Sequence, residues 1–433
     1  MKIKIMTQKI SLIGTTALLS LVILALANCS ASGGSSGSSG CSSKTACCTY
    51  PTNMDTSVTS LPAANAVSSN NTMIVNVGCG YINEPCVSVT ICEVGSTTKC
   101  RTINNILLDT GSYGLRLFNC GIDALNLPTE TVNSREVAEC VSYADGTQDW
   151  GPVKKADIYL AGQLASNANF QYVDANYATA PTSCSNRENN PSLVGFNGIL
   201  GVGLFTHDCG ANCVTSASYG LYYTCSGTSC TSSTMSLANQ VSNPVSLLGA
   251  SYNNGVSLDF SSFNSSSAVT TAGQMTIGIS SLSSVSVYSA SSQGSFNTLF
   301  NSTVYGVSSS NNSQAFIDSG SNGLFFPPPG GLTACSTSGS ASGFYCPPSS
   351  QNFTAYVSGS TTTPTTSSRA VPFQIDNANT MLDSSNPNYV FTNLGGSFSG
   401  AFDWGLPFFL SRRVYVQMQG TTIGGSVGPA WGF

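Results

Sequence analysis

A chain of 433 residues in which 41% are hydrophobic is long enough to bury one large core or two medium ones. Charged residues make up only 8%, against roughly 25% in ordinary soluble proteins, so long exposed helices rich in Lys and Glu are not expected. The net charge is −5 and the 14 basic residues are scattered, which argues against a nucleic-acid partner. This composition favours short strands joined by polar turns.

The N-terminus has the form of an export signal. Three lysines precede an apolar run over residues 10–27, so residues 1–28 are interpreted as a signal peptide. Cys29 follows Leu26-Ala27-Asn28 as in a bacterial lipobox, and removing it from the 17 cysteines leaves an even number. Lipidation at Cys29 and ordinary signal cleavage both stay open. Residues 29–70 are rich in small polar residues and are expected to form a flexible tether.

These features predict an exported protein that is either a lipoprotein of the bacterial cell envelope or secreted. Its only expected membrane contact is an N-terminal lipid anchor. The many cysteines also favour an oxidising compartment. Proximity along the chain predicts disulfides for Cys209/Cys213, Cys225/Cys230 and Cys335/Cys346, whereas the vicinal Cys47 and Cys48 are expected to bond distant partners.

Short segments that alternate or are β-branched, bounded by Ser, Asn or Gly, predict strands from about residue 73 to the C-terminus. No long helical period is evident. The clearest predicted strands lie at residues 73–77, 256–260, 275–279, 285–288 and 414–418.

One internal repeat divides the chain. Ile-Leu-Leu-Asp-Thr-Gly-Ser-Tyr-Gly-Leu at residues 106–115 recurs as Ala-Phe-Ile-Asp-Ser-Gly-Ser-Asn-Gly-Leu at residues 315–324. Asp, Gly, Ser, Gly and Leu match in register, and the copies are too far apart for a solenoid repeat. We therefore expect a duplicated fold, with one β unit over residues 71–245 and a second over residues 246–433.

Elimination leaves carboxylates as the reactive groups. The single histidine, His207, lies in no nucleophile motif, so a Ser-His-Asp or Cys-His mechanism is not expected. The cysteines are expected to be oxidised, which argues against a zinc site. Neither a metal nor an organic cofactor is predicted.

Asp109 and Asp318 are the predicted catalytic pair. In each copy an apolar strand would deliver the Asp to a tight turn, where the Gly permits close approach of the chain. Two carboxyls held face to face share one proton, so the ionised member can activate a water and the protonated member can polarise a peptide carbonyl. The residues predicted to support the pair are Thr110, Gly111, Ser112, Ser319, Gly320 and Ser321.

These motifs resemble those of pepsin-like aspartic proteases, over most of the chain from about residue 73. Residues 197–203 (Asn-Gly-Ile-Leu-Gly-Val-Gly) and 402–410 look like the segments that pass beneath the two catalytic turns. The hairpin containing Tyr143 and Gly146 resembles the flap that covers the substrate. The resemblance implies an all-β, bilobal double β-barrel with the active-site cleft between the lobes, acting on a peptide or protein substrate.

Two features depart from that pattern, Arg116 and the Trp404-Gly405 pair, which stands where a clean apolar pair before Gly is usual. Arg116 stands where such proteases usually carry a Trp that hydrogen-bonds the flap Tyr, and Trp150 is a candidate replacement. Asp145 and Asp149, on either side of the flap turn, are expected to be solvated.

The chain is also similar, more narrowly, to the bacterial family DUF3443, whose function is unknown. The residues that carry this resemblance are Asp-Gly-x-x-x-Trp-Gly-Pro-Val at 145–153, Asn-Gly-Ile-Leu-Gly-Val-Gly at 197–203, Asp-Cys-Gly-x-x-Cys at 208–213 and Phe-Asp-Trp-Gly-Leu-Pro-Phe-Phe at 402–409.

The predicted function is that of an exported aspartic endopeptidase. One alternative is an inactive pepsin-like surface protein that binds peptide or glycan, since fold does not fix function. Another is a Ser/Thr-rich adhesin with a coincidental repeat, in which strands would extend along a rod and Asp109 would lie far from Asp318.

Overall fold

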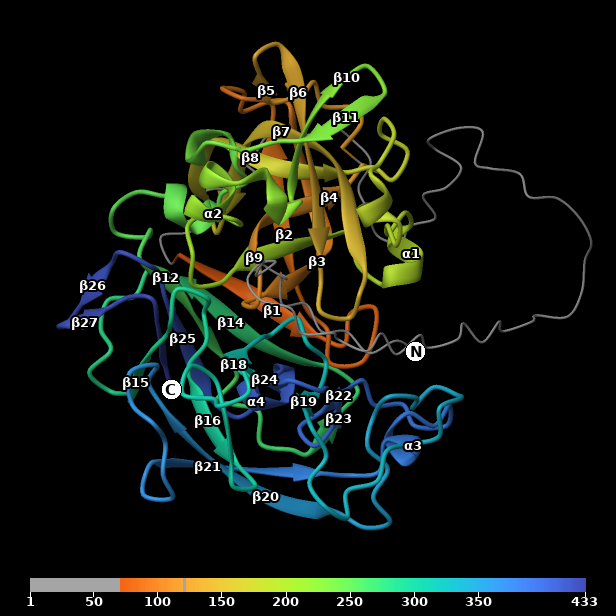
Figure 1. The fold of residues 1–433 in the computed structure, drawn as a ribbon, viewed down its shortest axis with the longest axis vertical. Helices are drawn as coiled ribbons and strands as arrows, with labels where there is room; N and C mark the ends of the chain where they lie inside the picture. The colour runs from red at the N-terminus through yellow and green to blue at the C-terminus, as the bar shows by residue number, and fades with distance from the viewer. Residues whose placement is uncertain (1–70, 120–121) are drawn as a thin grey trace, which may run out of the picture.

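The computed structural model describes residues 71–119 and 122–433 (Figure 1). The predicted signal peptide over residues 1–28, the lipidation site Cys29 and the tether over residues 29–70 lie outside this part. Within it, no helix has the length and apolarity needed to cross a bilayer.

The expected all-β class is confirmed, because strands form nearly all of the regular structure. The α-helices have 4 or 5 residues each. They are α1 (Pro191–Val194), α2 (Ala211–Thr215), α3 (Ala378–Met381) and α4 (Leu406–Phe409). Short 3-10 turns lie at Thr182–Cys184, Ala217–Tyr219, Leu237–Asn239 and Pro244–Leu247.

Six strands of the first half close into a barrel, because β2 pairs with both β3 and β7. In order around the ring they are β2 (Pro85–Cys92), β3 (Cys100–Asp109), β9 (Gly198–Val202), β4 (Tyr113–Phe118), β8 (Gln163–Val173) and β7 (Gln148–Leu160). A sheet extends from β7 through β6 (Arg135–Ser142) and β10 (Tyr222–Ser226) to β11 (Ser229–Ser232), and β5 (Thr131–Val132) also pairs with β6.

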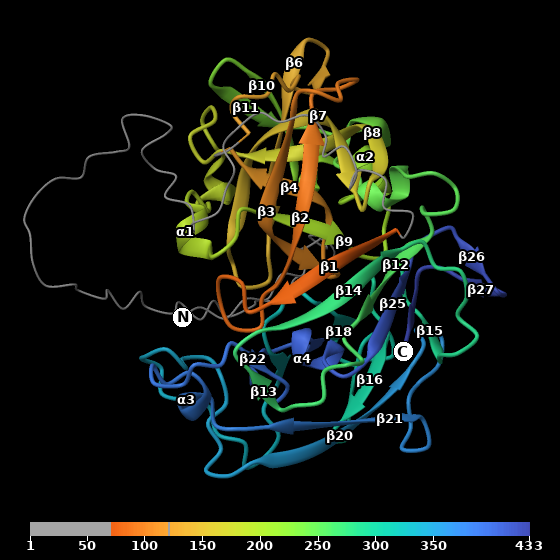
Figure 2. The same ribbon diagram turned by 180° about the vertical axis from the view of Figure 1, so that it is seen from behind.

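A second group of strands continues the same sheet into the C-terminal half. Strand β1 pairs with β2 at one end and along its whole length with β14, so it joins the two halves (Figures 1 and 2). In sheet order these strands are β1 (Thr72–Val77), β14 (Thr271–Ile277), β12 (Gly255–Asp259), β25 (Arg413–Gln417), β28 (Ala430–Gly432) and β15 (Val287–Ser289). The strands predicted at residues 73–77, 256–260 and 414–418 are confirmed to within one residue at each end. Those predicted at 275–279 and 285–288 also fall on strands of this group, but β14 ends at Ile277 and β15 begins at Val287.

The remaining strands of the C-terminal half form separate sheets. One contains β17 (Thr303–Tyr305), β16 (Asn297–Phe300), β20 (Gln351–Ser358) and β21 (Arg369–Ile375). A second contains β18 (Gln314–Ile317), β24 (Ala401–Trp404), β19 (Leu324–Phe326) and β23 (Gly395–Ser397). Two-stranded pairs are β13 (Ser267–Ala268) with β22 (Val390–Phe391), and β26 (Thr422–Ile423) with β27 (Ser426–Val427).

The sequence repeat is matched by a repeated strand arrangement. In the first half β3 runs parallel to β9, β9 antiparallel to β4, and β4 parallel to β8. In the second half β18, β24, β19 and β23 pair in the same order and with the same directions. The two arrangements lie one above the other near the middle of the molecule (Figure 1). The duplication therefore places the two Asp-containing turns at equivalent points.

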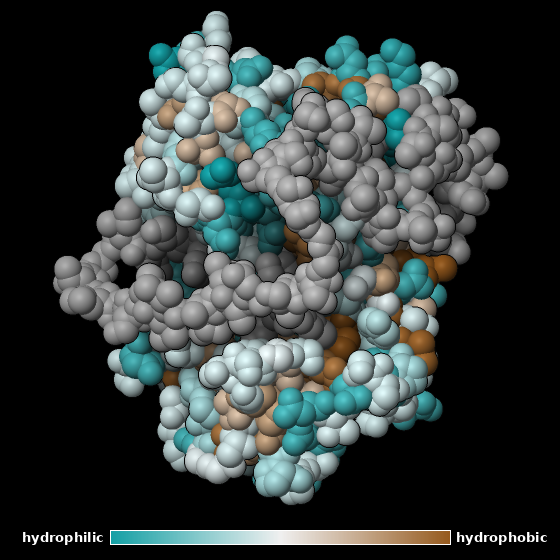
Figure 3. Space-filling view, turned by 90° about the vertical axis from the view of Figure 1, so that its right-hand side faces the viewer, coloured by the Kyte–Doolittle hydropathy of each residue, from teal (hydrophilic) through white to brown (hydrophobic). Residues whose placement is uncertain are grey.

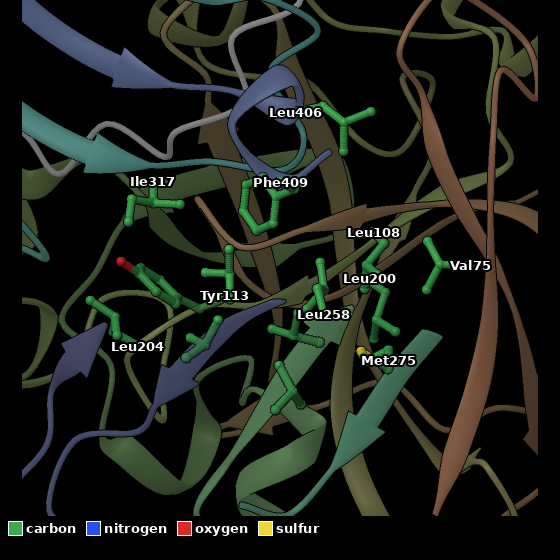
Figure 4. Close-up of a cluster of buried hydrophobic side chains, with 14 of the residues drawn as sticks. Val75, Leu108, Tyr113, Leu200, Leu204, Leu258, Met275, Ile317, Leu406 and Phe409 are labelled. Carbon is green, nitrogen blue, oxygen red and sulfur yellow. The ribbon is translucent and has the colours of Figure 1, made fainter. Parts of the chain in front are cut away.

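One hydrophobic cluster packs beneath both turns (Figure 4). Leu108 and Ile317, the residues immediately before the two aspartates, are both fully buried in it. Leu200, Leu406 and Phe409 pack in the same cluster, so residues of both halves share one core. Burial of this apolar area in close packing gives the two turns a rigid base.

Six disulfides link described cysteines, and the three predicted from spacing are confirmed. The others join Cys79 to Cys86, Cys92 to Cys100 and Cys140 to Cys184. Such bonds fit a protein of an oxidising compartment. On the face seen in Figure 3, the coloured residues are mostly hydrophilic or neutral, with hydrophobic ones in small groups, although few residues of the chain are charged.

Candidate active site

Both predicted catalytic aspartates lie at the ends of buried apolar strands. Asp109 is the last residue of β3, and Asp318 directly follows β18. Neither side chain is exposed. The apolar residues before each Asp are buried because they fill the shared core. The strands that they form therefore end with the two carboxyls at the boundary between the two halves.

The residue after each Asp bonds across to the other turn. The amide of Thr110 donates to Ser319 Oγ at 3.1 Å, and the amide of Ser319 donates to Thr110 Oγ1 at 3.0 Å. The Thr110 hydroxyl donates to the carbonyl of Ile317 at 3.1 Å, and the Ser319 hydroxyl to that of Leu108 at 2.7 Å. These four buried bonds are reciprocal, so each turn fixes the position of the other.

The carboxylate of Asp109 is held by its own turn. Its Oδ1 accepts from the amide of Gly111 at 2.7 Å, and its Oδ2 accepts from the hydroxyl of Ser112. Bonds from both donors favour the ionised form of a carboxyl.

Asp318 is held in the equivalent way. Its Oδ1 accepts from the amides of Gly320 at 2.8 Å and Ser321 at 3.2 Å, and its Oδ2 from the Ser321 hydroxyl at 2.9 Å. The side chain also lies against Gly111, where a Cβ atom would come within 2.5 Å of Asp318 Cγ. The chain can carry only Gly at position 111 if the two aspartates are to approach this closely.

Burial raises the pKa of Asp109 well above its ordinary value, and the charge of Asp318 and a hydrogen bond with it raise it further. The Ser112 and Gly111 bonds oppose the rise without cancelling it. The protonated form of Asp109 is therefore favoured beside the charge of Asp318.

The hairpin predicted as a flap is present between β6 and β7. The amide of Gly146 donates to Tyr143 O at 3.0 Å, and the amide of Tyr143 to Thr147 O at 2.9 Å. The Tyr143 ring is buried, and its hydroxyl donates to Asp149 Oδ2 at 2.9 Å.

Two expectations about this hairpin are wrong. Asp149 is not solvated but buried, with 3% exposure, and it accepts a hydrogen bond from the hydroxyl of Tyr143. Asp145 is half-buried. Trp150 does not replace the Trp that the resemblance places at position 116, since its indole N–H donates to the carbonyl of Tyr177 at 2.7 Å.

Arg116 lies close enough to this hairpin for the charges of Tyr143 and Asp149 to act on it. It is fully buried and donates to Glu139 at 3.0 Å, to Asp208 at 3.3 Å and to the carbonyl of Tyr113 at 2.6 Å. Burial, followed by the charge of Glu139, raises the pKa of Asp208 well above its ordinary value. No local sequence pattern predicts this network, because its members come from β4, β6 and the loop after β9.

A loop between β1 and β2 borders the site from a third direction. The side chain of Asn83 donates to the carbonyls of Asn322 and Phe391, each at 2.9 Å, so it ties the loop to the second Asp turn. Burial raises the pKa of Tyr81 well above its ordinary value, followed by the charges of nearby acids that include Asp109. Tyr81 also lines a cavity of about 510 Å³ whose walls include residues 192–195 and 381–384.

A third buried carboxyl, Asp403, was not predicted as a site residue. It lies in β24, beside the second Asp turn, with no exposed surface. Sequence reasoning could have found it, because it occupies the position that Ile199 holds in the first copy, where an apolar residue is expected.

The arrangement differs from the rod expected for an adhesin, in which Asp109 and Asp318 would lie far apart. Among residues 71–119 and 122–433, no group of three or more His, Cys, Asp or Glu side chains is placed to hold a metal ion. Fold and site thus define an all-β protein in which a duplicated Asp-[Thr/Ser]-Gly-Ser turn brings two buried carboxyls together.

The chain belongs to the DUF3443 family, described as a protein family of unknown function, which matches residues 39–433. A search of curated proteins finds no significant match.

Proposed function

We propose that this protein is an exported aspartic endopeptidase, in which Asp109 and Asp318 act together on a water molecule. In this proposal the two halves are the lobes of a pepsin-like scaffold, and the peptide lies between them. The observation that carries the proposal is the reciprocal bonding of Thr110 and Ser319, which holds two carboxyls face to face.

The chemistry needs one protonated and one ionised carboxyl. The ionised member removes a proton from water as the water oxygen bonds to the peptide carbonyl carbon, and the protonated member gives its proton to the carbonyl oxygen. The resulting diol collapses as a proton moves from it, by way of the pair, to the amide nitrogen and the C–N bond breaks. The products are a carboxylic acid and an amine, and the pair again holds one proton.

The surroundings of the dyad are consistent with this chemistry. Burial and the charge of Asp318 raise the pKa of Asp109, so a protonated member persists at mildly acidic pH. The cavity lined by Tyr81 receives residues from both halves and offers room for part of a peptide. Neither aspartate is exposed, so substrate can reach the pair only after the surrounding chain moves.

The test is cleavage of unfolded casein by the purified exported protein between pH 3 and 7, with and without pepstatin. We expect pepstatin-sensitive cleavage that Asp109→Asn and Asp318→Asn each abolish without loss of folding. The matched control is Asp123→Asn, an exposed acid remote from the dyad, which should cleave like the wild type. Absence of cleavage at every pH, or full activity in either dyad variant, contradicts the proposal.

One observation favours a second candidate function, a non-catalytic protein that binds peptide or glycan on the same scaffold. Both carboxyls are completely buried in the described structure, as would suit acids that only hold their own turns in shape. This candidate predicts binding of casein peptides without any hydrolysis.

Localisation in the cell envelope through a lipid on Cys29 is part of the proposal. The six disulfides support an oxidising compartment outside the cytoplasm. Replacement of Cys29 by Ala should release the protein from the membrane fraction of the cell. If the variant stays membrane-bound, the anchor is not at Cys29.

A further inference from the structure

Asp403 faces away from the aromatic core that surrounds its neighbours in β24. Phe402 stacks on Phe326 with ring centroids 5.1 Å apart, and Trp404 meets Phe373 at 5.8 Å. Because side chains alternate along a strand, Asp403 points to the opposite face of the sheet. Phe325, its partner on β19, packs there in a cluster that includes Ile82 and touches Ala144 of the Tyr143 hairpin.

This carboxyl has no hydrogen-bond partner among the described residues. Neither Oδ1 nor Oδ2 of Asp403 receives a hydrogen bond, although both are buried. The Ser321 hydroxyl lowers the pKa of Asp403 as a weak hydrogen-bond donor would, but its well-formed bond, at 2.9 Å, goes to Asp318 Oδ2. Burying an unpaired polar group costs free energy, and burying an unpaired charge costs more. Such a group is either held in its neutral form or takes a partner that the described residues do not supply.

The charged groups that act on Asp403 are acidic, like Asp403 itself. Burial raises its pKa well above the ordinary value, and the charges of Asp318 and Asp109 add to this effect. Asp403 takes part in none of the ion pairs that involve described Lys and Arg side chains. The acidic groups are not arranged as ligands of a metal ion in the described part of the chain.

A second buried polar group beside the dyad, the hydroxyl of Tyr81, also lacks a hydrogen-bond partner among the described residues. The carboxyls of Glu84, Asp109, Asp145 and Asp318 all act on it. The dyad therefore sits in a desolvated region of negative potential, which attracts and orients a positive charge.

We propose that Asp403 is a specificity-determining residue that binds the positively charged side chain of a Lys or Arg in the substrate, next to the bond that is cut. This inference rests on the proposed endopeptidase function and specifies its substrate class. A substrate cation supplies the partner that Asp403 lacks, whereas a neutral side chain leaves the carboxyl unpaired. Because Asp403 lies beside the turn of Asp318, the basic residue binds on that side of the dyad.

The experiment uses peptides that differ only in the residue beside the cleaved bond, which is Lys, Arg, norleucine or Glu. For the wild type we expect kcat/KM to be about 30-fold or more higher for Lys and Arg than for norleucine, the effect of pairing a buried charge. Asp403→Asn should remove this preference while the norleucine peptide is still cut, and the control Asp123→Asn should keep it. Equal cleavage of all peptides by the wild type, or an unchanged preference in Asp403→Asn, overturns the proposal.

Binding separates failure of this inference from failure of the proposed function. Fluorescence anisotropy with labelled peptides, in the Asp109→Asn background, should show tighter binding of the Lys peptide than of the norleucine peptide. The difference should vanish in Asp109→Asn/Asp403→Asn. Charge-dependent binding without any cleavage by the wild type refutes hydrolysis and leaves the cation site standing. Cleavage with no charge dependence in either measurement refutes the cation site alone, and absence of both refutes both.

A folding measurement excludes a purely structural role. Asn has the shape of Asp, and no described bond is lost in the exchange, so Asp403→Asn should unfold at a urea concentration equal to or above that of the wild type. If Asp403→Asn is strongly destabilised, Asp403 is a structural residue with a partner inside the protein, and the proposal fails.

Discussion

Thr110 and Ser319 each donate a backbone amide to the hydroxyl oxygen of the other, at 3.1 and 3.0 Å. Each hydroxyl then donates to a carbonyl two residues before the other residue, on Ile317 or Leu108. The two halves are thereby joined by a symmetric set of buried bonds directly behind the carboxyls. These bonds explain why the residue after each Asp carries a hydroxyl group, which is Thr in the first copy and Ser in the second.

Removal of one of these hydroxyls should destabilise the protein. Thr110→Val keeps the side-chain shape but leaves the amide of Ser319 and the carbonyl of Ile317 buried without partners. We expect a loss of roughly 1–3 kcal/mol in the free energy of unfolding, measured with urea. The control Thr354→Val changes an exposed strand residue and should stay within about 0.5 kcal/mol of the wild type. Equal stability of the two variants would show that the bonds across the halves contribute nothing.

Gly111→Ala should abolish the proposed hydrolysis. The added methyl would lie 2.5 Å from Asp318 Cγ, so the two carboxyls must separate. Displacement of a reacting group by about 1 Å can cost 100-fold in rate, and we expect kcat/KM to fall at least that much. Gly330→Ala, where the methyl meets no atom within 4 Å, is the control and should be fully active. An active Gly111→Ala protein would mean that the dyad geometry is not needed.

Arg116→Met should be among the most destabilising substitutions. It leaves Glu139 and Asp208 buried without their cation, which typically costs about 3–5 kcal/mol. The loss should be smaller at pH 4 than at pH 7, because burial raises the pKa of Asp208 and protonation removes its charge at the lower pH. Arg135→Met, at an exposed position of β6, should change stability little at either pH. A loss that is independent of pH would argue against charge burial as its cause.

The stability of Asp403→Asn relative to the wild type should depend on pH in one direction. The pKa of Asp403 is raised in the folded state above its unfolded value of about 3.9. At a pH between these two pKa values, the folded protein binds more protons than the unfolded protein does. Wild-type stability is therefore lost as pH rises through that window, whereas Asn does not titrate. Urea unfolding at several pH values should show the advantage of Asp403→Asn growing from pH 4 to pH 7. A constant difference would indicate that Asp403 does not titrate abnormally.

Local patterns in the sequence were sufficient for the strands and for the two Asp turns. Alternation identified β1 and β14, because mainly one face of each strand is buried. The repeat identified Asp109 and Asp318, because duplication preserves the turn. The buried charges were missed for a physical reason. Burial of Arg116 and of Asp149 is decided by partners that only the tertiary fold supplies, as with the hydroxyl of Tyr143. Neither position differs from a solvated one in its local sequence.

The most direct measurement is kcat/KM on one cleaved peptide for the wild type, Asp109→Asn, Asp318→Asn and the double variant. If the two carboxyls divide one proton and act as a unit, each single variant should lose roughly 10⁴-fold or more, and the double variant should be no worse than either. Losses that multiply in the double variant, or substantial turnover by either single variant, would contradict a joint action of Asp109 and Asp318.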